Sequence, residues 1–335
     1  MLSLLGSLGE KMKRQDFINN PNLLLKEKES LENLNKHVEN DIKNFIASEE
    51  EKYHAQVREL VEDFLDSNKK MILLCGPTSA GKTTTSKIIT ERLEKFGYSS
   101  KTISLDNFLV PLAERKILSD GALDYDSFST INVELFNSFI KDLFRYQKAE
   151  MPIYNFVKNR PEDFKETVEI SSHSILIIEG LHALNPDLFT TAENKNLSYK
   201  IYIAPNVDFY LNDKLVLNAK TLRLMRRSLR DYYKRGANIE QTFKTWNHTV
   251  ESENLYIKPY KTTVDYIINS TLKYELLLYA KYLKPILLRE ENSEKLFDLL
   301  KPLEALSTIE KDLVPADSML WEFLTKWFTL YQNVV

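Results

Sequence analysis

The sequence predicts an α/β protein in which helices flank a parallel sheet. Short apolar runs suited to buried strands occur at residues 71–75, 101–105, 174–180 and 199–204, with helical patterns between them. Such alternation is typical of parallel sheets with right-handed crossover connections. The 335 residues, 43% of them hydrophobic and 28% charged, suffice for one large packed domain with extensions or for two modest ones.

Helical patterns precede and follow these strands. Residues 1–48 predict a helical N-terminal extension, and one helix would gather five apolar side chains on one face: Leu31, Leu34, Val38, Ile42 and Phe45. The next helix would do the same for another set: Val57, Leu60, Val61, Phe64 and Leu65. From Tyr274 onward the pattern is helical and leucine-rich, with breaks at Pro285, Pro302 and Pro315. We therefore expect three parts, at residues 1–48, 49–275 and 276–335.

A glycine-containing loop joins the first strand to a helix that bears Ile89, Leu93 and Phe96 on one face and ends at Gly97. The loop fits G-x-x-x-x-G-K-[ST], in which the glycines let successive N–H groups point at phosphate oxygens and the helix adds its positive end. The predicted ATP-binding residues are Gly76, Pro77, Thr78, Ser79, Ala80, Gly81, Lys82, Thr83 and Thr84. Of these, Lys82 would reach the β- and γ-phosphates, and the Thr83 hydroxyl would bind Mg²⁺. The fold is thus predicted to be a P-loop NTPase-type sheet with helical extensions at both ends.

Other motifs narrow the class of P-loop protein. A switch GTPase would carry D-x-x-G and N-K-x-D, whereas "NKNL" at 194–197 lacks the aspartate and no D-x-x-G or ABC-type "LSGGQ" occurs. A small-molecule kinase needs a carboxylate near the γ-phosphate, an acid that holds the metal, and mobile positive charge over the transferred phosphoryl group.

Two acidic residues meet the first two needs. Asp106 follows the strand at 101–105, and right-handed winding returns the end of this strand to the sheet edge that holds the P-loop. It would act as base or substrate ligand; the alternative is an ordinary loop or N-cap aspartate. Glu179 ends the strand at 174–180 and would hold Mg²⁺ directly or through water. The alternative is a solvated strand-end glutamate.

Arginines supply the positive charge. Arg223, Arg226, Arg227 and Arg230 are spaced to share one helix face, and Arg235 follows. This spacing suits a lid that clamps phosphate. The alternatives are a solvated basic face and a nucleic-acid patch.

The combination of segments resembles the uridine kinase/phosphoribulokinase family of P-loop kinases, and most closely its bacterial uridine kinase-like nucleoside kinases. The resemblance covers roughly residues 50–330 and rests on "GPTSAGKTTTSK", "SLDNF", "LDYDSF", "PIYNFVKNR", "ILIIEGLHAL" and "RLMRRSLRDYYKRGANIEQ", which occur in this order.

The resemblance implies roles for individual residues. Asp106 would activate the sugar 5′-hydroxyl, and Asp126 would bind the ribose hydroxyls, with Asp124 as the fallback. Tyr154 and Arg160 would line the nucleoside site.

The same resemblance places the arginines in the lid and Glu179 beside the metal. Arg226 and Arg230 would join Lys82 in catalysis, and Arg223 and Arg227 would bind ATP.

Two segments depart from pyrimidine-specific members of the family. Those enzymes carry "DHPDAFD" after the ribose acid and a histidine in "YDFxxHxR", whereas this chain reads "DSFSTIN" and "YNFVKNR", with Asn159 nearby. The base of the nucleoside therefore stays open.

The expected function is ATP- and Mg²⁺-dependent phosphorylation of a nucleoside 5′-hydroxyl. One alternative is a kinase for a pantothenate-like, ribulose-phosphate or other sugar substrate. Another is an ATP-binding regulatory or RNA-associated protein without turnover. A net charge of −3 and the lack of an RNA-binding motif argue against a nucleic-acid partner.

The chain ends and the single cysteine bear on location. Cys75 cannot form an internal disulfide, and neither a signal peptide nor an apolar stretch of about 18 residues is recognisable. We expect a cytoplasmic protein without a membrane partner. The leucine-rich ends leave a homo-oligomer open.

Overall fold

A five-stranded parallel sheet forms the centre of the computed structural model, which describes residues 26–324 except 119, 122, 172 and 290–293. The helical expectation for residues 1–25 and 325–335 lies outside the described residues. The strand order is β10-β7-β2-β6-β3. The strands are β2 (Met71–Cys75), β3 (Ser99–Ser104), β6 (Ser174–Gly180), β7 (Ser198–Ala204) and β10 (Tyr266–Asn269). The predicted fold class, with a P-loop between the first sheet strand and its helix, is confirmed.

The order of the strands determines which loops meet. The chain leaves β2, forms α4 (Lys82–Lys95) and returns as β3, with β6 between β2 and β3. In register, Cys75 lies beside Gly180 and Ser104 beside Glu179. The carboxyl ends of β2, β6 and β3 therefore share one edge of the sheet, which is where open α/β sheets bind ligands.

Alternating side chains of β2 point to opposite faces of the sheet, as expected for a strand buried on both sides. Ile72 and Leu74 join one apolar core, and Met71, Leu73 and Cys75 join the other.

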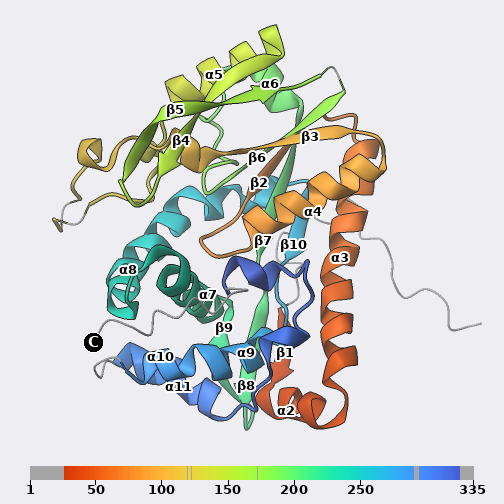
Figure 1. Ribbon diagram of the computed structural model, residues 1–335, viewed down its shortest axis with the longest axis vertical. Helices are drawn as coiled ribbons and strands as arrows, with labels where there is room; N and C mark the ends of the chain where they lie inside the picture. The colour runs from red at the N-terminus through yellow and green to blue at the C-terminus, as the bar shows by residue number, and fades with distance from the viewer. Residues whose placement is uncertain (1–25, 119, 122, 172, 290–293, 325–335) are drawn as a thin grey trace, which may run out of the picture.

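Helices cover both faces of this sheet (Figure 1). The first core is completed by α3 (Ile42–Asp66), α4 and the C-terminal helices, and the second by α5 (Val133–Tyr146). The C-terminal helices are α9 (Glu275–Tyr282), α10 (Lys284–Leu287) and α11 (Glu294–Glu304).

The N-terminal part differs from the expected single helix over residues 31–45. Instead, α2 (Leu31–Asn40) ends before Asp41, whose carboxylate accepts the Asn44 N–H and caps α3. Before α2, the short strand β1 (Glu27–Ser30) pairs with β8 (Val207–Leu211).

The expected division of the chain into three parts stays a prediction. Residue 48, its first limit, lies within α3, and residue 275, its second, is the first residue of α9.

Besides β1, two hairpins and the strand β10 add to the predicted elements. β4 (Lys148–Asn155) pairs with β5 (Arg160–Glu169), and β8 pairs with β9 (Lys214–Asn218). Neither hairpin nor strand β10 was predicted.

The remaining helices connect the sheet to the chain end. They are α6 (Ala192–Asn196), α7 (Ala219–Arg235) and α8 (Ile239–Tyr256). After α11 the chain returns to the P-loop as the 3-10 turn η6 (Met319–Glu322). Among the described residues no helix combines the length and apolarity that crossing a membrane requires.

Candidate active site

The P-loop leaves β2 through a space that admits only glycine. A Cβ on Gly76 would lie 2.2 Å from the Ile203 carbonyl oxygen of β7. Lys82 begins α4, and its Nζ donates to the carbonyl oxygens of Gly76 (2.9 Å) and Pro77 (3.2 Å). The lysine thus lies across the mouth of the loop, from where it can exchange these carbonyls for phosphate oxygens.

Asp106 and Glu179 lie close to Lys82 at the same sheet edge. Asp106 belongs to the 3-10 turn η1 (Leu105–Phe108) that follows β3, and Glu179 is the second-last residue of β6. Burial raises the pKa of Glu179 to about 7, the Asp106 charge adds to the rise, and Lys82 opposes it. The structure therefore brings together three of the residues predicted from the sequence.

This charge balance fits a divalent cation, because a cation beside Glu179 would relieve the repulsion between two carboxylates. The described residues contain no group of three or more His, Cys, Asp or Glu side chains arranged for a metal. A magnesium ion here would depend on Thr83, Glu179 and phosphate oxygens, as Mg²⁺ sites in kinases do.

The structure separates the two candidate ribose acids. The Asp124 carboxylate accepts hydrogen bonds from the N–H groups of Asp126 (3.3 Å) and Ser127 (3.0 Å) and from the Ser127 hydroxyl. These bonds stabilise the turn to which Asp124 itself belongs. The Asp126 carboxylate instead accepts the Thr249 hydroxyl of α8 at 2.9 Å. Burial raises the pKa of Asp126, Arg227 opposes the rise, and the Asp106 charge adds to it. Asp126 therefore lies close enough to Asp106 and Arg227 for their charges to act on its carboxylate.

His182 contacts the backbone of Asp126, and no role was predicted for it from the sequence. Its Nε2 lies 3.0 Å from the Asp126 carbonyl oxygen, and the side chain is 2% exposed. Burial lowers the pKa of His182 to about 4, so the ring is neutral near pH 7 and Nε2–H is the donor. Phe128 and Tyr256 contact the ring edge-on.

The β4–β5 hairpin brings Tyr154 next to the η1 turn that holds Asp106. Asn107, next to Asp106, accepts the Tyr154 N–H at 3.2 Å, and Arg115 donates to the Tyr154 hydroxyl at 3.0 Å. The Arg115 guanidinium also lies 5.7 Å from the Tyr154 ring centroid. Arg160 is half-exposed and pairs with Asp163 on its own strand. No hydrogen bond or ion pair of the described residues joins Arg160 to the other predicted site residues.

The arginines of α7 do not share one role. Arg226 is fully buried and donates to both oxygens of Glu275 (2.7 Å each) and to the Ser270 carbonyl oxygen (2.6 Å). The expectation that it belongs to a mobile lid is therefore wrong, because its edge of the helix faces the core. Its Nη1 lies 3.4 Å from the Ser79 carbonyl oxygen, so it supports the P-loop from behind.

Arg223 holds the loop in a similar way. It forms a bidentate ion pair with Glu253 of α8 (2.7 Å for each bond) and donates to the Thr78 carbonyl oxygen at 3.1 Å. Glu253 in turn accepts the Thr78 N–H at 3.0 Å.

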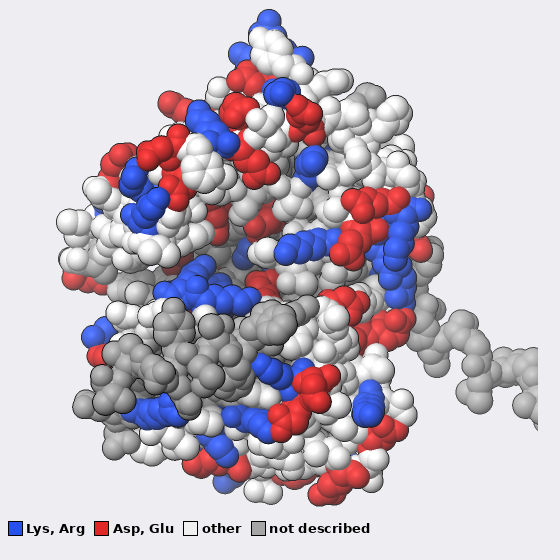
Figure 2. Space-filling model, in the orientation of Figure 1, with Lys and Arg blue, Asp and Glu red and all other residues white. Residues whose placement is uncertain are grey.

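The last three arginines gather around Asp231 near the end of α7. Arg227, Arg230 and Arg235 lie 3.2, 2.9 and 3.4 Å from its carboxylate. The Arg235 guanidinium also lies 5.2 Å from the ring centroid of Phe156 in the β4–β5 turn. Figure 2 shows Lys and Arg atoms along a hollow of the surface near α7 and α8. Arg227 also donates to the hydroxyls of Thr249 (2.6 Å) and Thr245 (2.9 Å), so each of its three guanidinium nitrogens has a partner.

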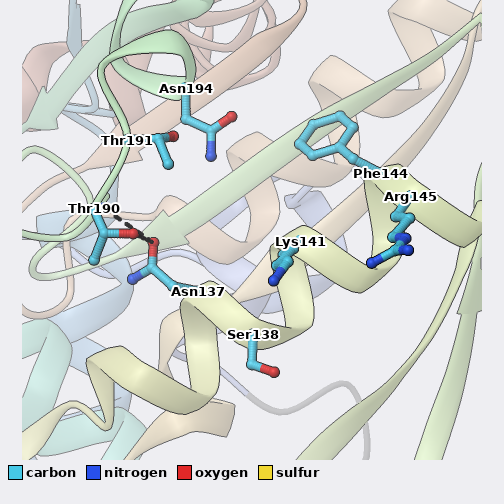
Figure 3. Close-up of a pocket in the computed structure, with 8 residues that line it drawn as sticks. All are labelled: Asn137, Ser138, Lys141, Phe144, Arg145, Thr190, Thr191 and Asn194. Atoms are coloured by element: carbon cyan, nitrogen blue, oxygen red, sulfur yellow. Dashed lines mark hydrogen bonds between the residues drawn. The ribbon is translucent and has the colours of Figure 1, made fainter.

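A separate pocket of about 570 Å³, lined mostly by polar and charged residues, lies between α5 and the segment 190–194 (Figure 3). Lys141 and Arg145 are among the residues that line it, but none of the predicted site residues does. The P-loop edge is therefore the better candidate for catalysis.

Comparison with known proteins identifies the family of the chain. The sequence profile described as Phosphoribulokinase / Uridine kinase family matches residues 71–276. The chain is 29% identical over 196 residues to a uridine kinase of Halobacterium salinarum, covering 58% of this chain and 77% of the relative. It is 26% identical over 203 residues to a uridine kinase of Bacillus pumilus, covering 60% and 87%.

Solved structures of kinases are similar in part. A possible uridine kinase from Bacillus stearothermophilus has a TM-score of 0.42 at 15% identity, covering 64% of this chain and 97% of that one. The D-glycerate 3-kinase from Cryptococcus neoformans has a TM-score of 0.44 at 16% identity, covering 60% and 88%.

The matched segment, residues 71–276, is more than half of the chain and contains the P-loop, Asp106, Glu179 and the α7 arginines. The chain therefore belongs to the Phosphoribulokinase / Uridine kinase family, and this membership implies a phosphotransferase that uses ATP.

Proposed function

We propose that this protein transfers the γ-phosphoryl group of ATP to the 5′-hydroxyl of a nucleoside. The observation that carries the proposal is the cluster of Lys82, Asp106 and Glu179 at one sheet edge, with Asp126 near enough for the Asp106 charge to act on it. A hydrolase would not need an acid placed to hold a sugar, whereas a nucleoside kinase does.

The P-loop would hold the triphosphate. Its N–H groups and the N-terminal end of α4 stabilise phosphate charge, and Lys82 would move from the loop carbonyls to the β- and γ-phosphates. Thr83 and Glu179 would hold Mg²⁺, which supplies charge neutralisation at the transferred group.

Asp106 would act as the general base. Its carboxylate accepts the proton of the substrate hydroxyl while the hydroxyl oxygen bonds to the γ-phosphorus and ADP leaves. Arg230 would stabilise the charge on the transferred oxygens, and Arg227 could join it by giving up its bonds to the hydroxyls of Thr245 and Thr249. Arg226, being fully buried, would not take part.

Asp126 and Tyr154 favour a nucleoside as the acceptor. A carboxylate can accept hydrogen bonds from two vicinal ribose hydroxyls, and an aromatic ring offers a face to a planar base. Relatives from archaea and bacteria carry the name uridine kinase, which supports the same class of substrate. The segments "DSFSTIN" and "YNFVKNR" leave the identity of the base open.

A panel of nucleosides tests the proposal. The purified chain would be incubated with ATP, Mg²⁺ and each of the common ribo- and deoxyribonucleosides, and nucleoside monophosphate would be detected by mass spectrometry. We expect a 5′-monophosphate from at least one nucleoside, and none from the matching 5′-deoxy analogue, which lacks the acceptor oxygen. Lys82→Met, purified in parallel, controls for contaminating kinases. Phosphorylation of pantothenate or a sugar, with no nucleoside accepted, would contradict the proposal.

A further inference from the structure

The segment Ser318–Leu324, here named the C-terminal strap, lies directly on the P-loop. The carboxylate of Glu322 accepts two hydrogen bonds from Thr84, one from its backbone N–H and one from its hydroxyl, each 3.2 Å long. Thr84 is the third residue of α4, so its N–H is one of the N–H groups that have no partner within the helix. A P-loop uses these groups to bind phosphate oxygens.

Side chains on both sides hold the strap in this position. Met319 packs against the backbone of Gly81, because its Sδ lies 2.0 Å from the point where a Cβ on Gly81 would be. From α7, Lys234 Nζ donates to the carbonyl oxygens of Trp321 (2.7 Å) and Glu322 (2.8 Å). The contact therefore joins the strap to the loop and to the arginine-bearing helix at once.

Further contacts anchor the strap to the core. Met319, Leu320 and Phe323 have no exposed surface, and the Arg226 guanidinium lies 5.1 Å from the Phe323 ring centroid. The Ser318 hydroxyl lies 3.2 Å from the hydroxyl of the buried Tyr274. The backbone of the strap is thus packed like core structure, whereas the Glu322 side chain is only half-buried.

A carboxylate at Thr84 and a nucleotide phosphate there exclude each other. Both are anions with acceptor oxygens, and both would use the same N–H and hydroxyl. The Glu322 charge also acts on Glu179, which places it in the electrostatic field of the active site.

We propose that the C-terminal strap is autoinhibitory: Glu322 occupies the position of a phosphate oxygen at Thr84, and a nucleotide must displace this carboxylate to bind. Since the strap backbone is packed in the core, displacement needs a change in the Glu322 side chain rather than release of the strap. The inference rests on the proposed function only in requiring that the P-loop bind ATP.

Measuring ATP affinity by calorimetry, without any acceptor substrate, tests the inference. When a nucleotide must displace a bound group, it can bind only the fraction of protein molecules in which the site is free. Its apparent Kd is therefore the intrinsic Kd divided by that fraction. Glu322→Ala should therefore bind ATP more tightly, on the order of tenfold for the loss of two hydrogen bonds to a charged acceptor. Glu322→Asp, in which the carboxylate is too short to reach Thr84, should tighten binding as well while keeping the charge.

The test also needs a matched control variant and a check that each variant folds. Glu304→Gln changes an exposed carboxylate on α11 and should leave ATP affinity as in the wild type. Melting temperatures identify a variant that fails to fold, and Glu322→Asp is the one that perturbs packing least. Unchanged or weaker ATP binding in both folded Glu322 variants would overturn the inference.

The outcome is separate from that of the nucleoside panel. If the Glu322 variants bind ATP more tightly but no nucleoside is phosphorylated, the autoinhibitory role of the C-terminal strap is supported and the proposed acceptor is contradicted. If ATP affinity is unchanged in these variants but a nucleoside monophosphate is formed, the autoinhibitory role is contradicted and the proposed acceptor is supported.

Discussion

The buried ion pair between Arg226 and Glu275 gives a prediction about which arginines act on substrate. Both side chains have no exposed surface, and two hydrogen bonds of 2.7 Å join them. Replacing one partner leaves the other charge buried without compensation, which costs about 3–5 kcal/mol. Arg226→Met and Glu275→Gln should each lower the free energy of unfolding by that amount.

The expected change in melting temperature follows from the size of the chain. With roughly 2.1 cal/mol/K of unfolding entropy per residue, 335 residues give about 0.7 kcal/mol/K. A loss of about 4 kcal/mol therefore lowers Tm by about 6 °C. The double variant Arg226→Met/Glu275→Gln should recover at least half of this loss, because neither charge is then left unpaired. Its glutamine can still accept the Tyr279 hydroxyl, which now donates to Glu275 at 2.7 Å.

Steady-state kinetics of the double variant distinguishes support of the P-loop from a role in the lid. If Arg226 only supports the loop from behind, kcat of the stable double variant should stay within about tenfold of the wild type. A residue that stabilises the transferred phosphoryl group contributes about 10²–10³-fold. A loss of that size in a double variant with normal Tm and ATP affinity would refute the assignment of Arg226 to the core.

Two further variants probe the acceptor side of the site. Asp126→Asn should raise KM for the nucleoside by roughly 10- to 100-fold with little change in KM for ATP, since a neutral amide binds vicinal hydroxyls less well; equal effects on both substrates would contradict a ribose-binding role. His182 has a folded-state pKa of about 4 against about 6.5 in the unfolded chain, so the unfolded state binds more protons between these values. Lowering the pH from 6.5 to 4 should therefore cost the wild type roughly 2–3 kcal/mol more than His182→Gln in urea unfolding, and parallel pH profiles would contradict it.

The strands at the sheet edge of the candidate site could be predicted from the sequence because their signals are local. "MILLC" and "SILIIEG" are apolar runs bounded by loop residues, and the P-loop motif follows the first of them. Parallel winding then places Asp106 and Glu179 beside the P-loop with no need for side-chain detail. These residues were found because both lie at the carboxyl end of a strand: Asp106 shortly after β3 and Glu179 in the second-last position of β6.

Other elements gave too little local signal. Strand β5 reads "RPEDFKETVE" and lacks the apolar alternation of a half-buried strand, so the hairpin that brings in Tyr154 was not predicted. The apolar spacing from Leu31 to Phe45 continues across Asp41, because such spacing records which side chains are apolar and not where the backbone breaks.

Contacts between distant segments could not be predicted from the sequence for a different reason. The spacing of the α7 arginines shows which of them lie near each other on a helix, but Glu275, which pairs with Arg226, lies 49 residues away. Glu322 lies 238 residues from Thr84, and nothing near either residue indicates that they meet. Such pairs depend on the packing of the whole chain.

The most direct test of the central claim is to measure kcat of the Asp106→Asn variant with ATP and an accepted nucleoside. A general base contributes about 10²–10⁴-fold, so kcat should fall by that factor while the Kd for ATP stays within about twofold of the wild type. Asp298→Asn, the same exchange on the exposed side of α11, should leave both values unchanged. A folded Asp106→Asn variant with nearly wild-type kcat would contradict the account.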